Sequence, residues 1–301
     1  MKANQERQKK NDPNRVEIYS HQIFNATSDI MKGLDKMSFQ QSKDMIGKSL
    51  RQDYSILEQA AQQNQNKYTA EVAHQVQVDQ SLQLIPCPYV KASSHKKYTL
   101  VLDLDETLLH YYEINEYDGD LRIRPGADDF LKSLSEYYEI IIFTAAMQDY
   151  ADWALDHFQN KSCISYRLYR QHASPFGGFY VKDLSRIGRD ISKTIIVDNI
   201  AENFQLQPEN GIFIKSWFID PQDTALLELA PLLISIAESN VNDVREALKL
   251  FRLHMLEQMA KGVMNPTMYL TQNIKEILKK YSESLSATET KLLEKNSQIK
   301  A

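Results

Sequence analysis

The sequence has few cysteines and no long apolar run, and both absences narrow the class of protein. Cys87 and Cys163 are the two cysteines in 301 residues, too few for a disulfide framework or a four-cysteine zinc site. We therefore expect a reducing intracellular compartment. No apolar run approaches the roughly 18 residues that cross a bilayer, so no transmembrane segment is expected. Residues 1–11 are polar and lack the apolar stretch of a signal peptide.

Positive charge is scarce in the middle of the chain. Residues 96–249 carry 15 basic and 25 acidic side chains, a net charge of −10, whereas residues 1–95 are net +2 and residues 250–301 net +3. Proteins that bind duplex nucleic acid present a clustered basic face. The acidic middle segment therefore argues against direct nucleic-acid binding.

Several catalytic signatures are absent as well. The seven histidines show no His-Glu-x-x-His spacing, which argues against a zinc protease, and no Rossmann glycine triplet follows a predicted strand. Gly47, Lys48 and Ser49 are similar to the end of a phosphate-binding P-loop. However, that motif has a glycine where this chain has Ser42, and no strand precedes it.

The chain divides into three parts by composition. Residues 1–95 contain 14 glutamines and conflicting helix and strand patterns, which predict a polar region that is partly disordered and partly helical. Residues 96–250 alternate strand-like and helix-like segments and form the predicted folded domain. Residues 251–301 are polar with one helical stripe from Ile274 to Tyr281, which predicts a helical C-terminal extension.

The middle part shows the pattern of an α/β protein. Nearly continuous apolar runs predict strands that are buried on both faces, and amphipathic spacing predicts helices between them. This alternation predicts a parallel sheet with helices on both faces, and in such sheets the site lies at the carboxyl ends of the strands. Strands are expected at 98–104, 139–143, 193–198 and 211–216, and helices after Pro125-Gly126 and at 148–158, 224–238 and 241–253.

The most specific feature is the run Asp-Leu-Asp-Glu-Thr from Asp103 to Thr107, at the end of the first predicted strand. Two carboxylates this close would normally repel each other, but they become useful when a cation and a phosphate lie between them. One can attack phosphorus while the other, held protonated by its surroundings, gives a proton to the leaving oxygen. The plain alternative is an acidic turn that Thr107 caps.

Three further groups follow in the chain. Thr144 comes directly after the second predicted strand, where its hydroxyl can meet a phosphate oxygen, and Lys182 lies in the segment 180–188. Asp198 and Asn199 end the third strand, where oxygen ligands suit a hard cation such as Mg²⁺. The ordinary alternatives are a helix cap, a surface lysine and a turn. Four such elements in this order favour a phosphoryl-transfer site.

These residues resemble the signature of the haloacid-dehalogenase superfamily: Asp-x-Asp-x-Thr, then Ser or Thr, then Lys, then a terminal acidic pair. Segments 103–110 and 180–189 are similar to the carboxy-terminal-domain phosphatases of RNA polymerase II and their small-phosphatase and Dullard relatives, and 195–199 and 215–227 extend the match. The resemblance implies a haloacid-dehalogenase-like (Rossmannoid) α/β fold without a large cap domain. It also implies a protein serine/threonine phosphatase.

The resemblance implies a catalytic role for four residues. Asp103 would be the nucleophile that forms an aspartyl-phosphate, and Asp105 would be the general acid and base. Thr144 and Lys182 would hold the transferring phosphoryl group, and Lys182 would also restrain the charge of the nucleophile.

The same resemblance implies Mg²⁺ as the cofactor. Its ligands would be a carboxylate oxygen of Asp103, the main-chain carbonyl of Asp105 and the side chain of Asn199. Asp198 would support the metal site through water.

Substrate binding is implied for two further residues. Thr107 would order the catalytic loop, and Arg170 aligns with an arginine that contacts the phosphopeptide in the small phosphatases, although segment 171–179 departs from those relatives. The dozen or so residues at 111–121 are too few for a folded cap, and an open site suits phosphoserine or phosphothreonine in a protein, the RNA polymerase II tail being one candidate. The side chains expected either to form an apolar pocket beside the site or to pack over the sheet edge are Tyr111, Tyr112, Ile114 and Tyr117.

Two other functions would keep this fold. A mitochondrial import-receptor branch of the family often loses the aspartates, so a catalytically silent binding module is one alternative, which the intact set here disfavours. A small-molecule phosphatase is the other, and the missing cap argues against it. The N-terminus carries Glu6, Asp12 and Glu17, unlike an acid-poor transit peptide, so the expected location is the nucleus or the cytoplasm.

Overall fold

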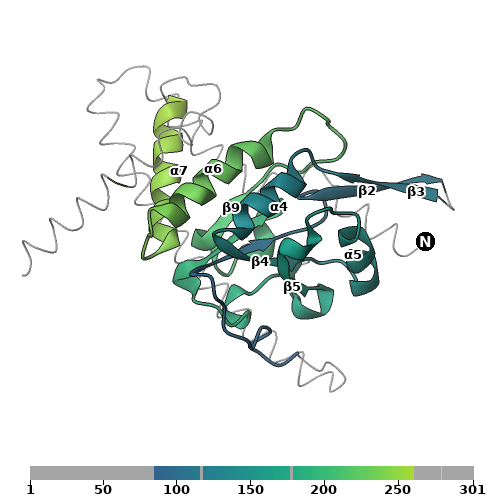
Figure 1. Cartoon of the computed structure of the whole chain (residues 1–301), viewed down its shortest axis with the longest axis horizontal. Coiled ribbons are helices and arrows are strands. Elements are labelled where there is room, and N and C mark those ends of the chain that lie inside the picture. The colour runs from purple at the N-terminus through teal and green to yellow at the C-terminus, as the bar shows by residue number, and fades with distance from the viewer. Residues whose placement is uncertain (1–84, 116–117, 177–178, 261–278, 280–301) are drawn as a thin grey trace, which may run out of the picture. The chain divides into compact units, whose positions relative to one another are not determined.

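The computed structural model describes residues 85–115, 118–176, 179–260 and Lys279. Its centre is a five-stranded sheet in the order β5-β4-β1-β8-β9, and every neighbouring pair is parallel. Figure 1 labels strands β4, β5 and β9 of this sheet and the helices that lie near it. The predicted α/β fold class with a parallel sheet is therefore confirmed. The five strands are β1 (Tyr98–Leu102), β4 (Tyr138–Phe143), β5 (Ile164–Leu168), β8 (Thr194–Asp198) and β9 (Gly211–Phe213).

Four of these strands were expected from their apolar runs, and β5 was not. Every residue of β1, β4 and β8 is buried, as expected for strands with both faces covered. β5 lies at one edge of the sheet, and four of its five residues stay partly or fully exposed. Its mixed sequence, Ile-Ser-Tyr-Arg-Leu, carries no continuous apolar run because an edge strand needs none.

The two faces of the sheet are covered by different kinds of element. The α-helices pack on the face that carries Leu100 and Leu102, whereas Val101 points into a second cluster on the opposite face. Within the described residues, short 3₁₀ turns and the segment around Val90 cover that second face, where α-helices were also expected. The helices are α4 (Ala127–Ser135), α5 (Gln148–Leu155), α6 (Ala225–Glu238) and α7 (Val244–Ala260).

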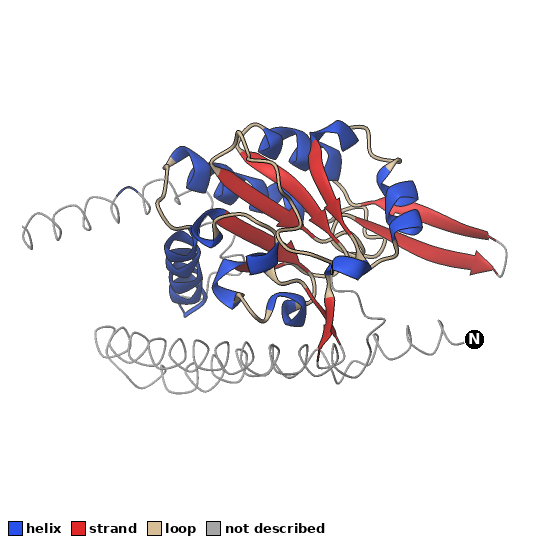
Figure 2. Ribbon diagram, turned by 90° about the horizontal axis from the view of Figure 1, so that it is seen from below, coloured by secondary structure: helices blue, strands red, loops and turns tan. Residues whose placement is uncertain are grey.

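Two antiparallel hairpins interrupt the alternation of strands and helices. β2 (Leu109–Asn115) and β3 (Asp118–Ile123) form a hairpin directly after the first strand's loop, and Figure 2 shows it extending beyond the sheet. β6 (Ser174–Phe176) pairs with β7 (Phe179–Val181). This first hairpin accounts for the described part of segment 111–121, so no large domain is inserted there, as the sequence predicted.

Several element ends differ from the sequence expectation. α5 stops at Leu155, three residues early, where Asp156 closes the helix and a turn buries Phe158. α7 begins at Val244 and continues to Ala260, across residue 250, where a domain boundary was expected. The region 1–84 and the helical stripe from Ile274 to Tyr281, apart from Lys279, lie outside the described residues. Within the described residues, no helix combines the length and apolarity needed to cross a membrane.

Candidate active site

Asp103 lies where the carboxyl ends of three strands meet. Leu102 is in register with Ile142 of β4 and Val197 of β8, and the Asp103 N–H donates to the Val197 carbonyl at 3.0 Å. The Asp103 side chain is only 7% exposed. The parallel sheet thus brings Asp103, Thr144 and Asp198 to one edge, as the sequence predicted.

The loop after Asp103 is held in one shape by backbone hydrogen bonds. The Leu104 carbonyl accepts from the N–H groups of Thr107, Leu108 and Leu109. Glu106 adopts a left-handed conformation with φ of 56°, which costs a non-glycine residue about 1–2 kcal/mol. Its own N–H donates to Leu109 and its carbonyl accepts from Trp217, and these bonds offset that cost.

Lys182 joins two aspartates in the interior. Its ammonium group is fully buried and lies 2.5 Å from Asp103 Oδ1 and 2.6 Å from Asp198 Oδ2. Burial alone would lower the pKa of Lys182, but the two carboxylates outweigh burial and raise it. The lysine therefore stays charged and opposes the negative charge of Asp103.

Asp198 is the most enclosed carboxylate of the site. Burial, and after it the charge of Asp103, raises the pKa of Asp198, although Lys182 opposes the rise. One oxygen accepts from the Ile200 N–H at 2.8 Å, and the Asn203 amide donates to both oxygens at 3.1 and 3.2 Å. These bonds engage both oxygens of Asp198, which suits a supporting role. Asn203 was not identified from the sequence because a 3₁₀ turn brings it back to the strand end.

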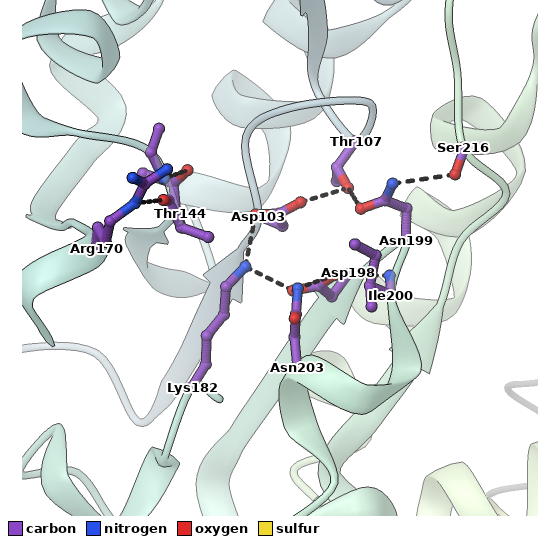
Figure 3. Close-up of polar contacts among 12 residues, drawn as sticks. Asp103, Thr107, Thr144, Arg170, Lys182, Asp198, Asn199, Ile200, Asn203 and Ser216 are labelled. Carbon is purple, nitrogen blue, oxygen red and sulfur yellow. Dashed lines mark hydrogen bonds and ion pairs between the residues drawn. The ribbon is translucent and has the colours of Figure 1, made fainter. Parts of the chain in front are cut away.

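Thr107 lies between the nucleophile candidate and Asn199. Its hydroxyl is 3.3 Å from Asp103 Oδ2 and 3.4 Å from Asn199 Oδ1. The Asn199 amide nitrogen donates to Ser216 Oγ at 3.0 Å, which orients the amide oxygen toward Thr107 (Figure 3). Ser216, after β9, is a second residue that sequence reasoning missed.

These oxygens fit a hard divalent cation. Asp103 and Asn199 offer oxygen atoms within reach of the same hydroxyl, and two carboxylates against one lysine leave the centre negative. Among the described residues no three His, Cys, Asp or Glu side chains cluster into a metal site. The candidate ligand set therefore includes an amide, and an Mg²⁺ ion is compatible with its chemistry.

Thr144 and Arg170 lie on the other side of Asp103 (Figure 3). The Thr144 hydroxyl accepts from the Ala146 N–H at 3.0 Å, and Thr144 is 1% exposed. The Arg170 side chain donates through Nε to the Ala145 carbonyl at 2.6 Å, and its guanidinium lies 4.9 Å from the centre of the Tyr180 ring. The structure thus attaches Arg170 to the loop that carries Thr144.

Asp105 has a hydrogen-bond partner that the sequence did not reveal. Tyr150, on α5, donates its hydroxyl to Asp105 Oδ1 at 2.6 Å. The Tyr150 ring meets Tyr111 edge-on at 6.0 Å and lies 6.0 Å from Trp153. Tyr150 was missed because it lies 45 residues further along the chain and only the packing of α5 brings it near.

Arg124 also anchors the loop that follows β1. This guanidinium is fully buried, donates to the carbonyls of Thr107 and Lys215 at 3.1 Å each, and pairs with both oxygens of Asp223. Arg124 therefore ties the loop after β1 to the loop after β9. Nothing in the local sequence around Arg124 indicated this anchoring role.

The aromatic residues of the first hairpin divide between its two faces. Tyr111 packs on Tyr150 and Trp153, beside Asp105, whereas Ile114 is 58% exposed and Tyr117 lies outside the described residues. Tyr112 lines a separate open cavity of about 380 Å³. The other lining residues of that cavity are Arg122, Ile123, Pro125, Trp217, Ile219 and Pro221.

The fold and the arrangement of these residues fit the expected haloacid-dehalogenase-like domain. Residues 98–245 match the family described as NLI interacting factor-like phosphatase. A protein from Danio rerio named CTD nuclear envelope phosphatase 1B is 38% identical over 180 residues, which cover 50% of this chain and 72% of that protein. The chain therefore belongs to the NLI interacting factor-like phosphatase family, and the expected family resemblance is confirmed.

Other relatives carry different names. A probable C-terminal domain small phosphatase from Dictyostelium discoideum is 44% identical over 162 residues, 49% of this chain. The match spans 52% of that protein, so this chain corresponds to about half of it. A mitochondrial import inner membrane translocase subunit tim50 from Aspergillus fumigatus is 41% identical over 154 residues, 51% of this chain and 31% of that protein.

Proposed function

We propose that this chain is a Mg²⁺-dependent protein serine/threonine phosphatase that works through an aspartyl-phosphate on Asp103. The observation that carries the proposal is the buried ion pair of Lys182 with Asp103 and Asp198, at the carboxyl ends of β1 and β8. A buried ion pair contributes little net stability, because desolvation offsets its attraction. The buried positive charge of Lys182 instead suits a site that must accept a phosphate dianion.

The first step forms a bond between an Asp103 oxygen and phosphorus while the ester bond to the serine or threonine oxygen breaks. Asp105 gives its proton to that leaving oxygen. In the second step water attacks the phosphoryl group, Asp105 takes the proton from the water, and the bond to Asp103 breaks to release phosphate. Tyr150 holds the Asp105 carboxyl in place through both steps.

The other site residues bind the charge that the phosphoryl group brings. Lys182 neutralises charge from one side, and the Thr144 hydroxyl hydrogen can donate to a phosphate oxygen because its oxygen already accepts from Ala146. Asp103, Asn199 and the main-chain carbonyl of Asp105 would hold Mg²⁺, with Asp198 supporting them. The bound ion would supply further positive charge to the phosphoryl oxygens.

The proposed substrate is phosphoserine or phosphothreonine within a protein segment. The hairpin β2–β3 leaves the site without an enclosing domain, so an extended chain can enter, and Arg170 lies beside Thr144 to receive it. The carboxy-terminal tail of RNA polymerase II is one candidate, given the names of the relatives. The nucleus or cytoplasm is the proposed location.

A second candidate, a catalytically silent binding module, is favoured only by the similarity to the tim50 subunit. That reading leaves the pairing of Lys182 with two buried aspartates unexplained. The two candidates differ in a direct assay, because a binding module would release no phosphate.

The test compares phosphoserine and phosphothreonine peptides with phosphotyrosine peptides, glycerol phosphate and sugar phosphates, with Mg²⁺ and with a chelator. We expect the highest kcat/KM for the first group, only with Mg²⁺. Asp103→Asn should lose at least about a thousandfold in turnover. Asp156→Asn, whose carboxylate is 63% exposed and pairs with Lys161 on the surface, is the matched control. A higher kcat/KM for a sugar phosphate would overturn the protein-substrate proposal.

A further inference from the structure

A segment before the first strand packs against the face of the sheet opposite the α-helices. We call residues 85–90 the N-terminal strap. The Tyr89 N–H donates to the Arg186 carbonyl and the Val90 N–H to the Ile187 carbonyl, both at 2.9 Å. Val90 is 3% exposed and belongs to the cluster on the face opposite the α-helices. The strap is therefore part of the folded domain.

The backbone at Gly188 shows how closely the strap approaches the segment that follows Lys182. Its φ is 91°, and a Cβ atom at this position would lie 2.5 Å from Pro88 Cβ and 2.7 Å from the Val90 carbonyl oxygen. A side chain at residue 188 would therefore displace the strap. The glycine allows the strap to contact the segment that begins with Lys182.

Tyr89 connects the strap to two further segments of the site. Its hydroxyl donates to the His172 carbonyl at 2.9 Å, and its ring meets the rings of Phe143 and His172 edge-on at 6.4 and 5.1 Å. The Arg186 guanidinium lies 5.3 Å from the centre of the same ring. Phe143 directly precedes Thr144, and His172 ends the turn that begins at Arg170.

The turn at Arg170–His172 is held by local bonds, such as the one from the His172 N–H to the Tyr169 carbonyl at 2.8 Å, and by contacts with other segments. It is a single 3₁₀ turn, closed by the bond from the Ala173 N–H to the Arg170 carbonyl. At its start the Arg170 N–H donates to the Ala146 carbonyl at 2.9 Å, and at its end Tyr89 holds the His172 carbonyl. Without the Tyr89 hydroxyl, the end of the turn would lose this side-chain anchor.

We propose that Tyr89 is a positioning residue, which fixes the Arg170 turn against the Thr144 loop in the geometry that receives a phosphopeptide. The inference rests on the proposed function in one respect, the contact of Arg170 with the peptide. Tyr89 itself touches no reacting atom. Substrate binding is thereby coupled to the chain segment that leads into the catalytic domain.

The test uses Tyr89→Phe in the full chain and Tyr138→Phe as a matched control. Tyr138 also donates its hydroxyl to a backbone carbonyl, that of Leu233, at 2.7 Å, but it faces the helices. We expect Tyr89→Phe to raise KM for a phosphoserine peptide about three- to tenfold, the scale of one hydrogen bond, with kcat nearly unchanged. Kinetics with a small aryl phosphate, which offers no peptide chain for Arg170 to contact, should not change. Equal effects of both variants on the peptide KM, or no effect of Tyr89→Phe, would overturn the inference.

Hydrogen exchange gives a readout that does not depend on activity. Tyr89→Phe should speed amide exchange in the peptide that contains residues 169–173 several-fold, while Tyr138→Phe should leave that peptide unchanged. Unchanged exchange in Tyr89→Phe would contradict the positioning role even if the chain hydrolyses phosphopeptides. Conversely, faster exchange in a chain without phosphatase activity would support the role of Tyr89 and count against the proposed function alone.

Discussion

At the scale of single residues, the site is organised around charges that are taken out of water. Lys182 is fully buried and pairs with two aspartates, one of which accepts three further hydrogen bonds from Ile200 and Asn203. Such a centre tolerates little change, because removal of one partner leaves an uncompensated buried charge. The aspartate that remains partly exposed, Asp105, is the one proposed to move protons.

Tyr150→Phe tests the positioning of Asp105. Loss of the 2.6 Å hydrogen bond should lower kcat/KM for a phosphoserine peptide about tenfold, because the poor leaving oxygen needs a well-placed proton donor. For a dinitrophenyl phosphate, whose leaving group needs no proton in the first step, kcat/KM should stay close to the wild-type value. The measurement is kcat/KM for both substrates.

The control for this prediction is Tyr112→Phe. It also removes a tyrosine–aspartate hydrogen bond, to Asp120 at 3.0 Å, but on the hairpin rather than at the catalytic loop. Its kcat/KM values should stay close to wild type. If Tyr150→Phe lowered kcat/KM for both substrates equally, its hydroxyl would not act through proton donation by Asp105.

The residues predicted from the sequence and those missed differ in a physical way. Asp103 begins the run Asp-Leu-Asp-Glu-Thr, which points to phosphoryl transfer by itself, and Lys182 was identified through the family resemblance of segment 180–189. Tyr150, Asn203 and Ser216 are ordinary residues in their local sequence, and only the fold brings them to the site. Thr144 combines an ordinary structural role with a place in the site. Its hydroxyl accepts from the Ala146 N–H, as that of a turn residue would, and it also lies beside Asp103.

At the scale of elements, the catalytic loop depends on a salt bridge between two connecting segments. Arg124 follows β3 and Asp223 precedes α6, and their pair is almost fully enclosed, with side chains 0% and 12% exposed. Four hydrogen bonds from one guanidinium join Thr107, Lys215 and Asp223. The loop geometry after β1 should therefore be sensitive to this arginine.

Arg124→Met should lower the free energy of unfolding by about 3–5 kcal/mol, since it breaks a buried ion pair and leaves two carbonyls without their donor. Arg122→Met is the matched control. Arg122 is 60% exposed and pairs with Asp120 on the surface, so its loss should cost less than about 1 kcal/mol. Urea unfolding measures both values, and equal losses would contradict the anchoring role of Arg124.

The elements that the sequence predicted well are those buried on both faces. β1, β4 and β8 were found because complete burial requires continuous apolar runs. The hairpin β2–β3 was expected only as a short uncapped segment, because its adjacent tyrosines, Tyr111 and Tyr112, face two different surroundings and form no apolar run on one face. Its fold depends on pairing between strands, which composition does not specify.

At the scale of the whole molecule, the folded domain begins earlier in the chain than the sequence predicted. The sequence placed residues 1–95 in a separate polar region, yet residues 85–90 contact the sheet through Tyr89 and Val90. Residues 98–245, which match the family, do not include this strap. The strap therefore adds to the catalytic domain a segment that neither the apolar pattern nor the family match marks.

Two truncations test this boundary. A chain that begins at residue 85 should unfold at higher urea concentration than one that begins at residue 91, because the shorter chain loses the buried Val90 side chain. Burial of one such side chain contributes about 1.5–3 kcal/mol. Identical unfolding midpoints would show that the strap does not stabilise the domain.

The central claim is that Asp103 carries the phosphoryl group during turnover, and chemical trapping tests it most directly. The full chain is mixed with a phosphoserine peptide and Mg²⁺, quenched in acid and reduced with borohydride, which converts an aspartyl-phosphate to homoserine. Peptide mass spectrometry then locates the product. We expect homoserine at position 103 and none in Asp103→Asn. Turnover without homoserine, or homoserine at position 105, would contradict it.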